Sequence, residues 1–311
     1  MATGLGLSGK LDELVREGAI QPQPVLSSEF LPSWLTNLIL ICLNRQKTRG
    51  QLPVPRCTHV VDVFCGYDAP LASAFAAAGF TAYAFDLAYG WDVLQKANIV
   101  QLVSYIITLV PGGLLWLGPP CNTWIWMSQS VYNRNAQNKW GGDPANQTAK
   151  EANAMGYLVA GFMRLATWLG VQFCVEQPSS SRLEHFPPFH KAVRMTMANC
   201  ILFHMAAFDE AIGCQKAMKV FSNAEWAQNL RRARNYCPPT SSDVYRVDLS
   251  GVTGGPGLRG TGHYPVVFAS YLVQQWVASG YQVPGTWRNW QDMMETSESD
   301  EAAQRAFECL R

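Results

Sequence analysis

Residues 60–79, VVDVFCGYDAPLASAFAAAG, decide the fold of this 311-residue chain. The stretch opens with a short run of β-branched and aromatic residues, Val60 to Phe64, which is typical of a buried strand. A turn containing Gly66 follows, and then an Ala-rich segment, Pro70 to Ala78, that ends at Gly79 and predicts a helix. A strand, a glycine turn and a helix in this order indicate an α/β fold.

The same alternation continues along the chain. The predicted elements are strands at Thr81–Phe85, Leu114–Leu117 and Val171–Val175, helices at Leu94–Leu109 and Ala149–Leu169, and a long polar surface loop at 127–148. Pro111-Gly112-Gly113 is expected to end the first of these helices. Ile201–Phe208 and Val220-Phe221 bracket Gly213 and predict an antiparallel hairpin. We therefore expect a mostly parallel, doubly wound sheet with helices on both faces and this hairpin at one edge.

Polar residues follow each predicted strand at the point where it ends. In chain order these residues are Cys65-Gly66-Tyr67-Asp68, Asp86, Pro119-Pro120-Cys121-Asn122 and Glu176-Gln177-Pro178. Because the carboxyl ends of parallel strands meet at one edge of a sheet, and ligands bind there, we expect these residues to form one site.

Each of them has a functional and a structural interpretation. A glycine turn with Asp86 at the next strand end suits a nucleoside-containing cofactor, or it is a plain helix-capping turn beside a surface acid. Two prolines hold Cys121 at a strand end, where a thiolate could act as a nucleophile, although free cysteines are often simply buried. Glu176 emerges from an apolar strand, so burial would raise its pKa and let it act as an acid near neutrality; a salt-bridged structural Glu is the alternative.

The order of these residues resembles that of the DNA cytosine-5 methyltransferases. That family carries a Phe-x-Gly-x-Gly cofactor loop, a Pro-Cys nucleophile loop and a Glu-Asn motif, which match Phe64-Cys65-Gly66, Pro120-Cys121 and Glu176-Gln177. Gly90-Trp91-Asp92-Val93 is similar to the family's third cofactor motif, with Asp92 at the position that contacts the adenine. The resemblance covers residues 58–125 best and 171–178 well, and is weaker at 216–223 and 262–265.

The resemblance implies an S-adenosylmethionine-dependent methyltransferase of Rossmann-like fold that methylates carbon 5 of a cytosine flipped out of DNA or of another nucleic acid. Cys121 would attack carbon 6 of the base, and Glu176 would hold or protonate the ring nitrogen. The residues expected to contact the cofactor are Phe64, Cys65, Gly66, Tyr67, Asp86, Asp92 and Pro119. The residues expected to contact the substrate are Asn122, Lys219, Arg231, Arg232 and Arg234.

The chain departs from the family pattern at several positions. Asp68 stands where the family has a second glycine, and its carboxylate would repel that of the cofactor unless it turns away. The two arginines of the family's Gln-x-Arg-x-Arg segment are replaced by Ala217 and Lys219, and lysine lacks the planar fork of arginine. Only about forty residues, 224–262, stand where the family usually has a large recognition region, and the run Arg231–Arg234 within them either touches phosphate or is an exposed helix end.

Composition excludes two classes of protein. Hydrophobic residues make up 48% of the chain and charged residues 15%, so disorder throughout is excluded. A net charge of +1 gives no global field toward phosphate, which excludes a basic nucleic-acid coat. Nine cysteines without a C-x-x-C pair predict no metal site. Without a signal pattern or a long apolar run, we expect an intracellular protein, nuclear or cytoplasmic, that does not engage a membrane.

The expected organisation has three parts. Residues 1–56 form a helical appendage with a linker from Arg45 to Pro55, residues 57–285 form the methyltransferase-like domain, and residues 286–311 form an acidic tail. Two other functions stay open. The chain could be a methyltransferase-like binding module without catalysis, or a thiol enzyme that pairs Cys121 with a histidine, for which His204 is the nearest candidate.

Overall fold

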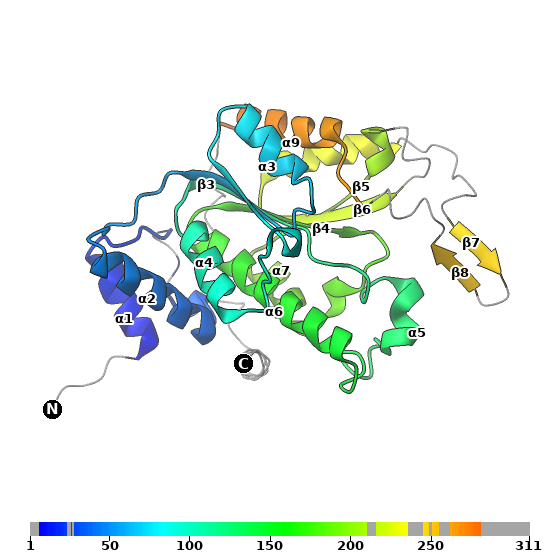
Figure 1. Ribbon diagram of the computed structural model, residues 1–311, viewed down its shortest axis with the longest axis horizontal. Helices are drawn as coiled ribbons and strands as arrows, with labels where there is room; N and C mark the ends of the chain where they lie inside the picture. The colour runs from blue at the N-terminus through cyan, green and yellow to red at the C-terminus, as the bar shows by residue number, and fades with distance from the viewer. Residues whose placement is uncertain are drawn as a thin grey trace.

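The computed structural model describes residues 6–23, 26, 28–209, 216–235, 245–248, 251–254 and 262–280. Within them the chain forms an α/β fold in which one mixed sheet lies between two layers of helices (Figure 1). Gly213, the acidic tail 286–311 and most of the segment 236–261 lie outside the described residues.

Six strands build the sheet: β1 (Thr58–Val63), β2 (Ala82–Phe85), β3 (Leu109–Leu117), β4 (Gln172–Pro178), β5 (Asn199–His204) and β6 (Ala217–Ser222). Their order is β2-β1-β3-β4-β6-β5. Strands β1 to β4 pair in parallel, whereas β6 pairs antiparallel with both β4 and β5. The predicted mostly parallel sheet with an antiparallel hairpin at one edge is therefore confirmed, and β6 lies between β4 and β5.

The order of the strands contains a reversal at β1. From β1 the chain crosses to β2 on one side and then returns to β3 on the other side. Adjacent crossovers that leave in opposite directions leave a crevice between the carboxyl ends of β1 and β3, which is where ligands bind on sheets of this kind.

Side chains alternate between the two faces of each strand and build two cores. Val60, Trp116 and Cys174 pack with α3 (Pro70–Ala77), α9 (Val266–Ala278) and the 3-10 helix η7 (Glu225–Asn235). Val61 and Phe173 pack on the other face, where α4 (Lys96–Ile106), α6 (Gln147–Trp168) and α7 (Pro187–Met195) lie. Figure 1 shows α3 and α9 above the sheet and α4, α6 and α7 below it.

Shorter elements complete the described fold. They are the 3-10 helices η1 (Ser28–Phe30), η2 (Leu87–Tyr89), η3 (Trp126–Ser128), η4 (Leu183–His185) and η5 (Met205–Ala207), the helix α5 (Gln129–Tyr132), and the antiparallel pair β7 (Tyr245–Asp248) and β8 (Gly251–Gly254). No helix among the described residues is long and apolar enough to cross a membrane.

The predicted boundaries of β3, β4, β5 and β6 differ from the observed ones, and the structure explains the differences at β3 and β4. The expected helix stop Pro111-Gly112-Gly113 lies inside β3, because α4 ends at Ile106 and the strand begins at Leu109. The β1–β3 register shifts there, and Gly112 adopts a φ of 71°, so the proline and glycines form an irregularity within the strand. Strand β4 continues through Glu176 to Pro178, because pairing with β6 extends it beyond the predicted end at Val175.

The N-terminal helices belong to the core of the sheet domain. Helices α1 (Leu7–Arg16) and α2 (Ser33–Thr48) pack on each other, and α2 also packs on α4. Trp34 of α2 lies so close to Gly161 of α6 that a Cβ at Gly161 would meet the indole at 2.4 Å. Helix α2 extends to Thr48, four residues into the predicted linker, and its buried residues lie on more than one face.

Candidate active site

The ends of β1, β3 and β4 bring three predicted segments to one edge of the sheet. Val63 pairs with Leu117 and Leu117 pairs with Val175, so the residues that follow β1 and β3 lie level with Glu176 in β4. A Cβ at Gly118 would lie 3.4 Å from the carbonyl oxygen of Phe64 and 3.8 Å from Oε2 of Glu176. A side chain larger than glycine at position 118 would therefore crowd this edge.

The turn after β1 is fixed by Asp86 at the end of β2. Phe64 and Gly66 adopt positive φ angles of 62° and 73°. Oδ2 of Asp86 accepts a hydrogen bond from the Gly66 N–H over 3.0 Å, and Oδ1 accepts one from Ala88 N–H over 2.9 Å. Each carboxylate oxygen keeps a lone pair for a further donor, so Asp86 holds the turn and can still accept from a ligand.

The other residues expected to contact the cofactor lie around this turn. The Cys65 side chain is buried, and burial, with the charges of Asp62 and Asp86, raises the pKa of its thiol to about 12. Tyr67 is exposed, and its ring stacks on that of Tyr89 with an interplanar angle of 10°. The thiol of Cys65 is therefore protonated at neutral pH, whereas Tyr67 and Tyr89 offer aromatic surface to a ligand.

Asp68 and Asp92 both lie near the rim of this edge. The Asp68 carboxylate is exposed and its Oδ2 lies 3.5 Å from Nδ1 of His263. Oδ1 of Asp92 accepts a hydrogen bond from the Leu94 N–H over 2.9 Å, which turns the chain into α4. The Asp68 carboxylate thus lies beside an imidazole ring.

Glu176 carries a buried carboxyl group with one oxygen unpaired. Its side chain is on the face of α9, and the residue is 8% exposed. Oε2 accepts a hydrogen bond from the Tyr264 hydroxyl over 2.9 Å, and that hydroxyl accepts one from Trp116 Nε1 over 3.2 Å. Oε1 is buried without a hydrogen-bond partner among the described residues. Burial raises the pKa of Glu176, which favours the protonated acid.

The partly exposed Cys121 lies within electrostatic range of Glu176. Burial and the charge of Glu176 together raise the pKa of the Cys121 thiol to about 11, although the charge of Lys216 opposes them. Lys216 also lowers the pKa of Glu176. The charges of Glu176 and Lys216 therefore both act on the Cys121 thiol.

Lys216 is a residue that sequence reasoning missed. The sequence pattern drew attention to Ala217 and Lys219 instead, because they occupy the two arginine positions. Val220 pairs with Glu176 and Lys219 pairs with Gln177, so Lys219 points to the opposite face of the sheet from Glu176. Its ammonium is 2.7 Å from the Ser181 carbonyl oxygen and 3.0 Å from Glu184 Oε2. The described contacts of Lys219 thus lie away from the carboxyl of Glu176.

The remaining predicted residues take structural or peripheral places. Pro119 is buried, and its carbonyl oxygen accepts a hydrogen bond from Gln177 Nε2 over 2.6 Å. Asn122 is exposed, and its Oδ1 accepts from the Thr123 N–H. Arg231 is exposed in η7 and donates to the Cys200 carbonyl oxygen over 3.3 Å. The side chains of Arg232 and Arg234 lie outside the described residues.

A buried arginine, Arg134, organises the predicted surface loop 127–148. Its guanidinium lies 3.5 Å from the centroid of the Trp124 ring and donates to Thr123 Oγ1, Asn153 Oδ1 and the carbonyl oxygen of Trp140. Thr123 and Trp124 lie two and three residues after Cys121 in the chain. The interior arginine therefore fixes the loop that carries the thiol, a role that only its isolated charge in an Asn-rich segment could have suggested.

Asp62 is a second buried group that the sequence analysis overlooked within the apolar strand. It is fully buried, Oδ2 accepts a hydrogen bond from the Ala72 N–H over 3.3 Å, and Oδ1 has no partner among the described residues. Helix α3 has no side-chain cap of its own at Ala69, so Asp62 caps it from the strand. Burial raises the pKa of Asp62 to about 7.

No protein-family model matches this chain, and neither does any curated protein.

Proposed function

We propose that this chain is an S-adenosylmethionine-dependent methyltransferase of Rossmann-like fold that methylates carbon 5 of cytosine in DNA through Cys121. The observation that carries the proposal is the coupling of the Cys121 thiol to the buried, half-paired carboxyl of Glu176, together with the strand pairing that brings the carboxyl ends of β3 and β4 level. Leaving Oε1 of Glu176 unpaired in the interior costs free energy, which a hydrogen bond to a bound base would recover.

The turn after β1 is compatible with the proposed cofactor. A Cβ at Gly66 would have nothing within 4 Å, so the turn faces open space. Asp86 and Asp92 would accept hydrogen bonds from the ribose and adenine, and Tyr67 offers an exposed ring beside them. Asp68, which would repel the carboxylate of the cofactor, faces His263. S-adenosylmethionine would supply the methyl group at this position.

The protonation states of Cys121 and Glu176 depend on each other. The negative charge of Glu176 raises the pKa of the Cys121 thiol, so protonation of Glu176, which its burial favours, removes the charge that opposes thiolate formation, and the thiol proton passes to solvent. The resulting pair is a thiolate and a neutral carboxylic acid. The thiolate adds to carbon 6 of cytosine, and the acid donates a hydrogen bond to the ring nitrogen, where negative charge accumulates.

Completion of the reaction restores the thiol. Carbon 5, made electron-rich by the addition, takes the methyl group, then loses its proton to a base, and the sulfur–carbon bond breaks to release the Cys121 thiolate. Lys216 would stabilise that thiolate, because its ammonium lowers the pKa of Cys121. Carbon 5 therefore exchanges a proton for a methyl group, with no net change at the sulfur.

Trapping of a covalent adduct tests the proposal directly. The intact chain is incubated with S-adenosylmethionine and DNA duplexes that contain 5-fluorocytosine, because fluorine at carbon 5 blocks release of the sulfur. We expect an adduct that survives denaturation in wild-type protein, that is absent in Cys121→Ser, and that persists in Cys57→Ser, which removes an exposed thiol outside this edge. An adduct in the Cys121→Ser variant would overturn the assignment of the nucleophile.

The alternative function, a methyltransferase-like binding module without catalysis, is favoured by one observation. The cation at the position of the second family arginine, Lys219, is buried and paired with Glu184 on the other sheet face. Calorimetric titration separates the two functions: cofactor binding without any adduct supports the module, whereas an adduct excludes it. The thiol enzyme with a catalytic histidine has no such support, since His204 lies at the end of the edge strand β5.

A further inference from the structure

A pocket lies at the opposite edge of the sheet from Cys121. It has a volume of about 260 Å³ and is enclosed between α2, α4 and the start of β1. Thr58, the first residue of β1, and Thr108, which precedes β3, form its floor, and Arg45 and Arg49 of α2 form one wall. A pocket of this volume suits a molecule smaller than a typical drug-sized ligand.

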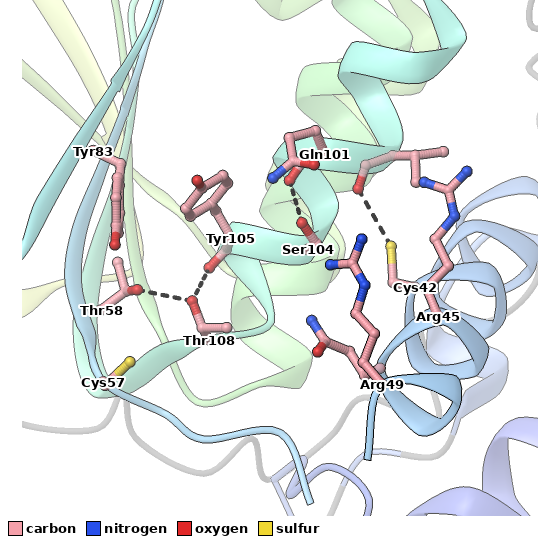
Figure 2. Close-up of a pocket in the computed structure, with 12 residues that line it drawn as sticks. Cys42, Arg45, Arg49, Cys57, Thr58, Tyr83, Gln101, Ser104, Tyr105 and Thr108 are labelled. Carbon is pink, nitrogen blue, oxygen red and sulfur yellow. Dashed lines mark hydrogen bonds between the residues drawn. The ribbon is translucent and has the colours of Figure 1, made fainter. Parts of the chain in front are cut away.

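Among the described residues, the C-terminal end of α2 carries two positive charges, Arg45 and Arg49, without a counter-charge. They lie four residues apart, and in Figure 2 the guanidinium group of Arg49 extends toward Ser104 of α4, whereas that of Arg45 lies on the other side of Cys42. Among the described residues, neither guanidinium makes an ion pair or a hydrogen bond. Like charges at this spacing repel each other, and an anion between them would relieve the repulsion.

The sequence around the pocket also lacks carboxylates. Segments 30–61 and 93–142 contain no Asp or Glu, and they supply every lining residue except Tyr83. Because the C-terminal end of a helix favours cations, the end of α2 by itself explains the two arginines. It does not explain the amide groups of Gln46 and Gln101, which add neutral donors to the same pocket.

The hydroxyl groups of the pocket, on Thr58, Thr108 and Ser104, are acceptors instead of donors toward a ligand. Ser104 Oγ donates to the Gln101 carbonyl oxygen, and Thr108 Oγ1 donates to that of Tyr105. With Thr108 acting as a donor there, Thr58 Oγ1, 2.8 Å away, donates to Thr108 Oγ1. The protons of these hydroxyl groups are thus engaged in hydrogen bonds within the protein, so these oxygens can act only as acceptors toward a ligand.

From these observations we propose that the pocket between α2 and α4 binds a small phosphate ester that carries hydroxyl groups, such as a sugar phosphate. The forks of Arg45 and Arg49 hold the phosphate oxygens, and the hydroxyl groups of the ligand donate to Thr58, Thr108 and Ser104. This site is separate from the proposed methyltransferase site, so its occupancy does not depend on Cys121.

Calorimetric titration with ribose 5-phosphate, at ionic strength kept constant with chloride, tests the proposal. Wild-type protein should bind it saturably, and Arg45→Gln/Arg49→Gln should bind at least about tenfold more weakly. Lys47→Gln is the matched control, because Lys47 is an exposed cation on the same helix outside the pocket. Loss of binding in Lys47→Gln as large as in the double variant, or equal binding in the double variant and wild type, overturns the proposal, as does absence of saturable binding in wild type.

Two further probes separate the parts of the ligand. Inorganic phosphate should bind more weakly than ribose 5-phosphate, and ribose alone should not bind measurably. Equal affinity for phosphate and ribose 5-phosphate would overturn the role assigned to Thr58, Thr108 and Ser104. Cys121→Ser should bind ribose 5-phosphate as wild type does, so that failure of the methyltransferase proposal and failure of this one remain distinguishable.

Discussion

Tyr264 and Glu176, 88 positions apart in the chain, are joined by a hydrogen bond of 2.9 Å between the phenol and the carboxyl Oε2. The bond connects the segment that precedes α9 to the end of β4, at the edge where a Cβ at Gly118 would lie 3.0 Å from the Tyr264 hydroxyl. Trp116 donates to the same phenol, so a chain of two hydrogen bonds orients the carboxyl group. The orientation of Glu176 therefore depends on a residue that lies late in the sequence.

Tyr264→Phe should destabilise the protein by roughly 1–3 kcal/mol, because it leaves Glu176 Oε2 and Trp116 Nε1 without their partner. It should also raise the pKa of Glu176 further, since the Tyr264 hydrogen bond lowers it. Urea unfolding measures the first effect. Tyr271→Phe, which removes another phenol from α9, is the control and should cost less. Equal losses in both variants would contradict the role of the Tyr264 bond.

The reactivity of Cys121 should follow the charges around it. With a pKa of about 11, the thiol should react slowly with iodoacetamide at pH 8 and faster as the pH approaches that value. Glu176→Gln should lower the pKa of Cys121 and speed its alkylation at pH 8, whereas Lys216→Met should raise the pKa and slow it. Peptide-resolved mass spectrometry follows the reaction at Cys121. Changes of the same sign in the two variants would contradict the electrostatic coupling.

The buried arginine of loop 127–148 should stabilise the segment that carries the thiol. Arg134→Met leaves acceptors of Thr123, Asn153 and Trp140 unpaired in the interior, and we expect a loss of about 2–4 kcal/mol in urea unfolding. Lys139→Met, at an exposed position of the same loop, should change stability by less than about 0.5 kcal/mol. Comparable losses of stability in Arg134→Met and Lys139→Met would show that the charge of the loop matters and that the buried contacts do not.

Stability should fall between about pH 4 and pH 7 because of Asp62. The pKa of this carboxyl rises from its ordinary 3.8 to about 7 on burial. The folded protein therefore retains a proton that the unfolded chain releases, and the free energy of unfolding decreases as the pH rises through this window. Asp62→Asn should flatten that dependence and stabilise the protein at pH 8, as measured by thermal unfolding. If stability falls as steeply with pH in Asp62→Asn as in wild type, the pH dependence belongs to other groups.

The contact between α2 and α6 should tolerate no methyl group at Gly161. Alanine in a helix ordinarily stabilises by about 0.5–1 kcal/mol relative to glycine. Here its Cβ would meet the Trp34 ring at 2.4 Å, so Gly161→Ala should instead destabilise by roughly 1–3 kcal/mol. Adding Trp34→Leu should recover part of that loss, so the double variant should be less destabilised than the sum of the two single variants predicts. Stabilisation by Gly161→Ala alone would contradict the tight contact.

Much of the fold follows from local pattern. The runs around Val61, Leu115 and Phe173 predict buried strands, and the Ala-rich and long apolar segments predict α3 and α6, because the side-chain period and the helix-ending glycines are local properties. The element boundaries near Pro111 and Glu176 were not predictable in this way. Pairing with a distant strand extends β3 and β4 past their local signals.

By itself the sequence determined that Cys121 follows one strand and that Glu176 lies near the carboxyl end of the neighbouring parallel strand, because the alternation of elements places both at one carboxyl edge. Only the tertiary structure decided which cation acts on these two side chains. Insertion of β6 between β4 and β5 sets the register in which Lys219 turns to the other face, while Lys216 acts on both groups. Tyr264, Arg134 and Asp62 owe their places to contacts between segments distant in sequence, which no local period encodes.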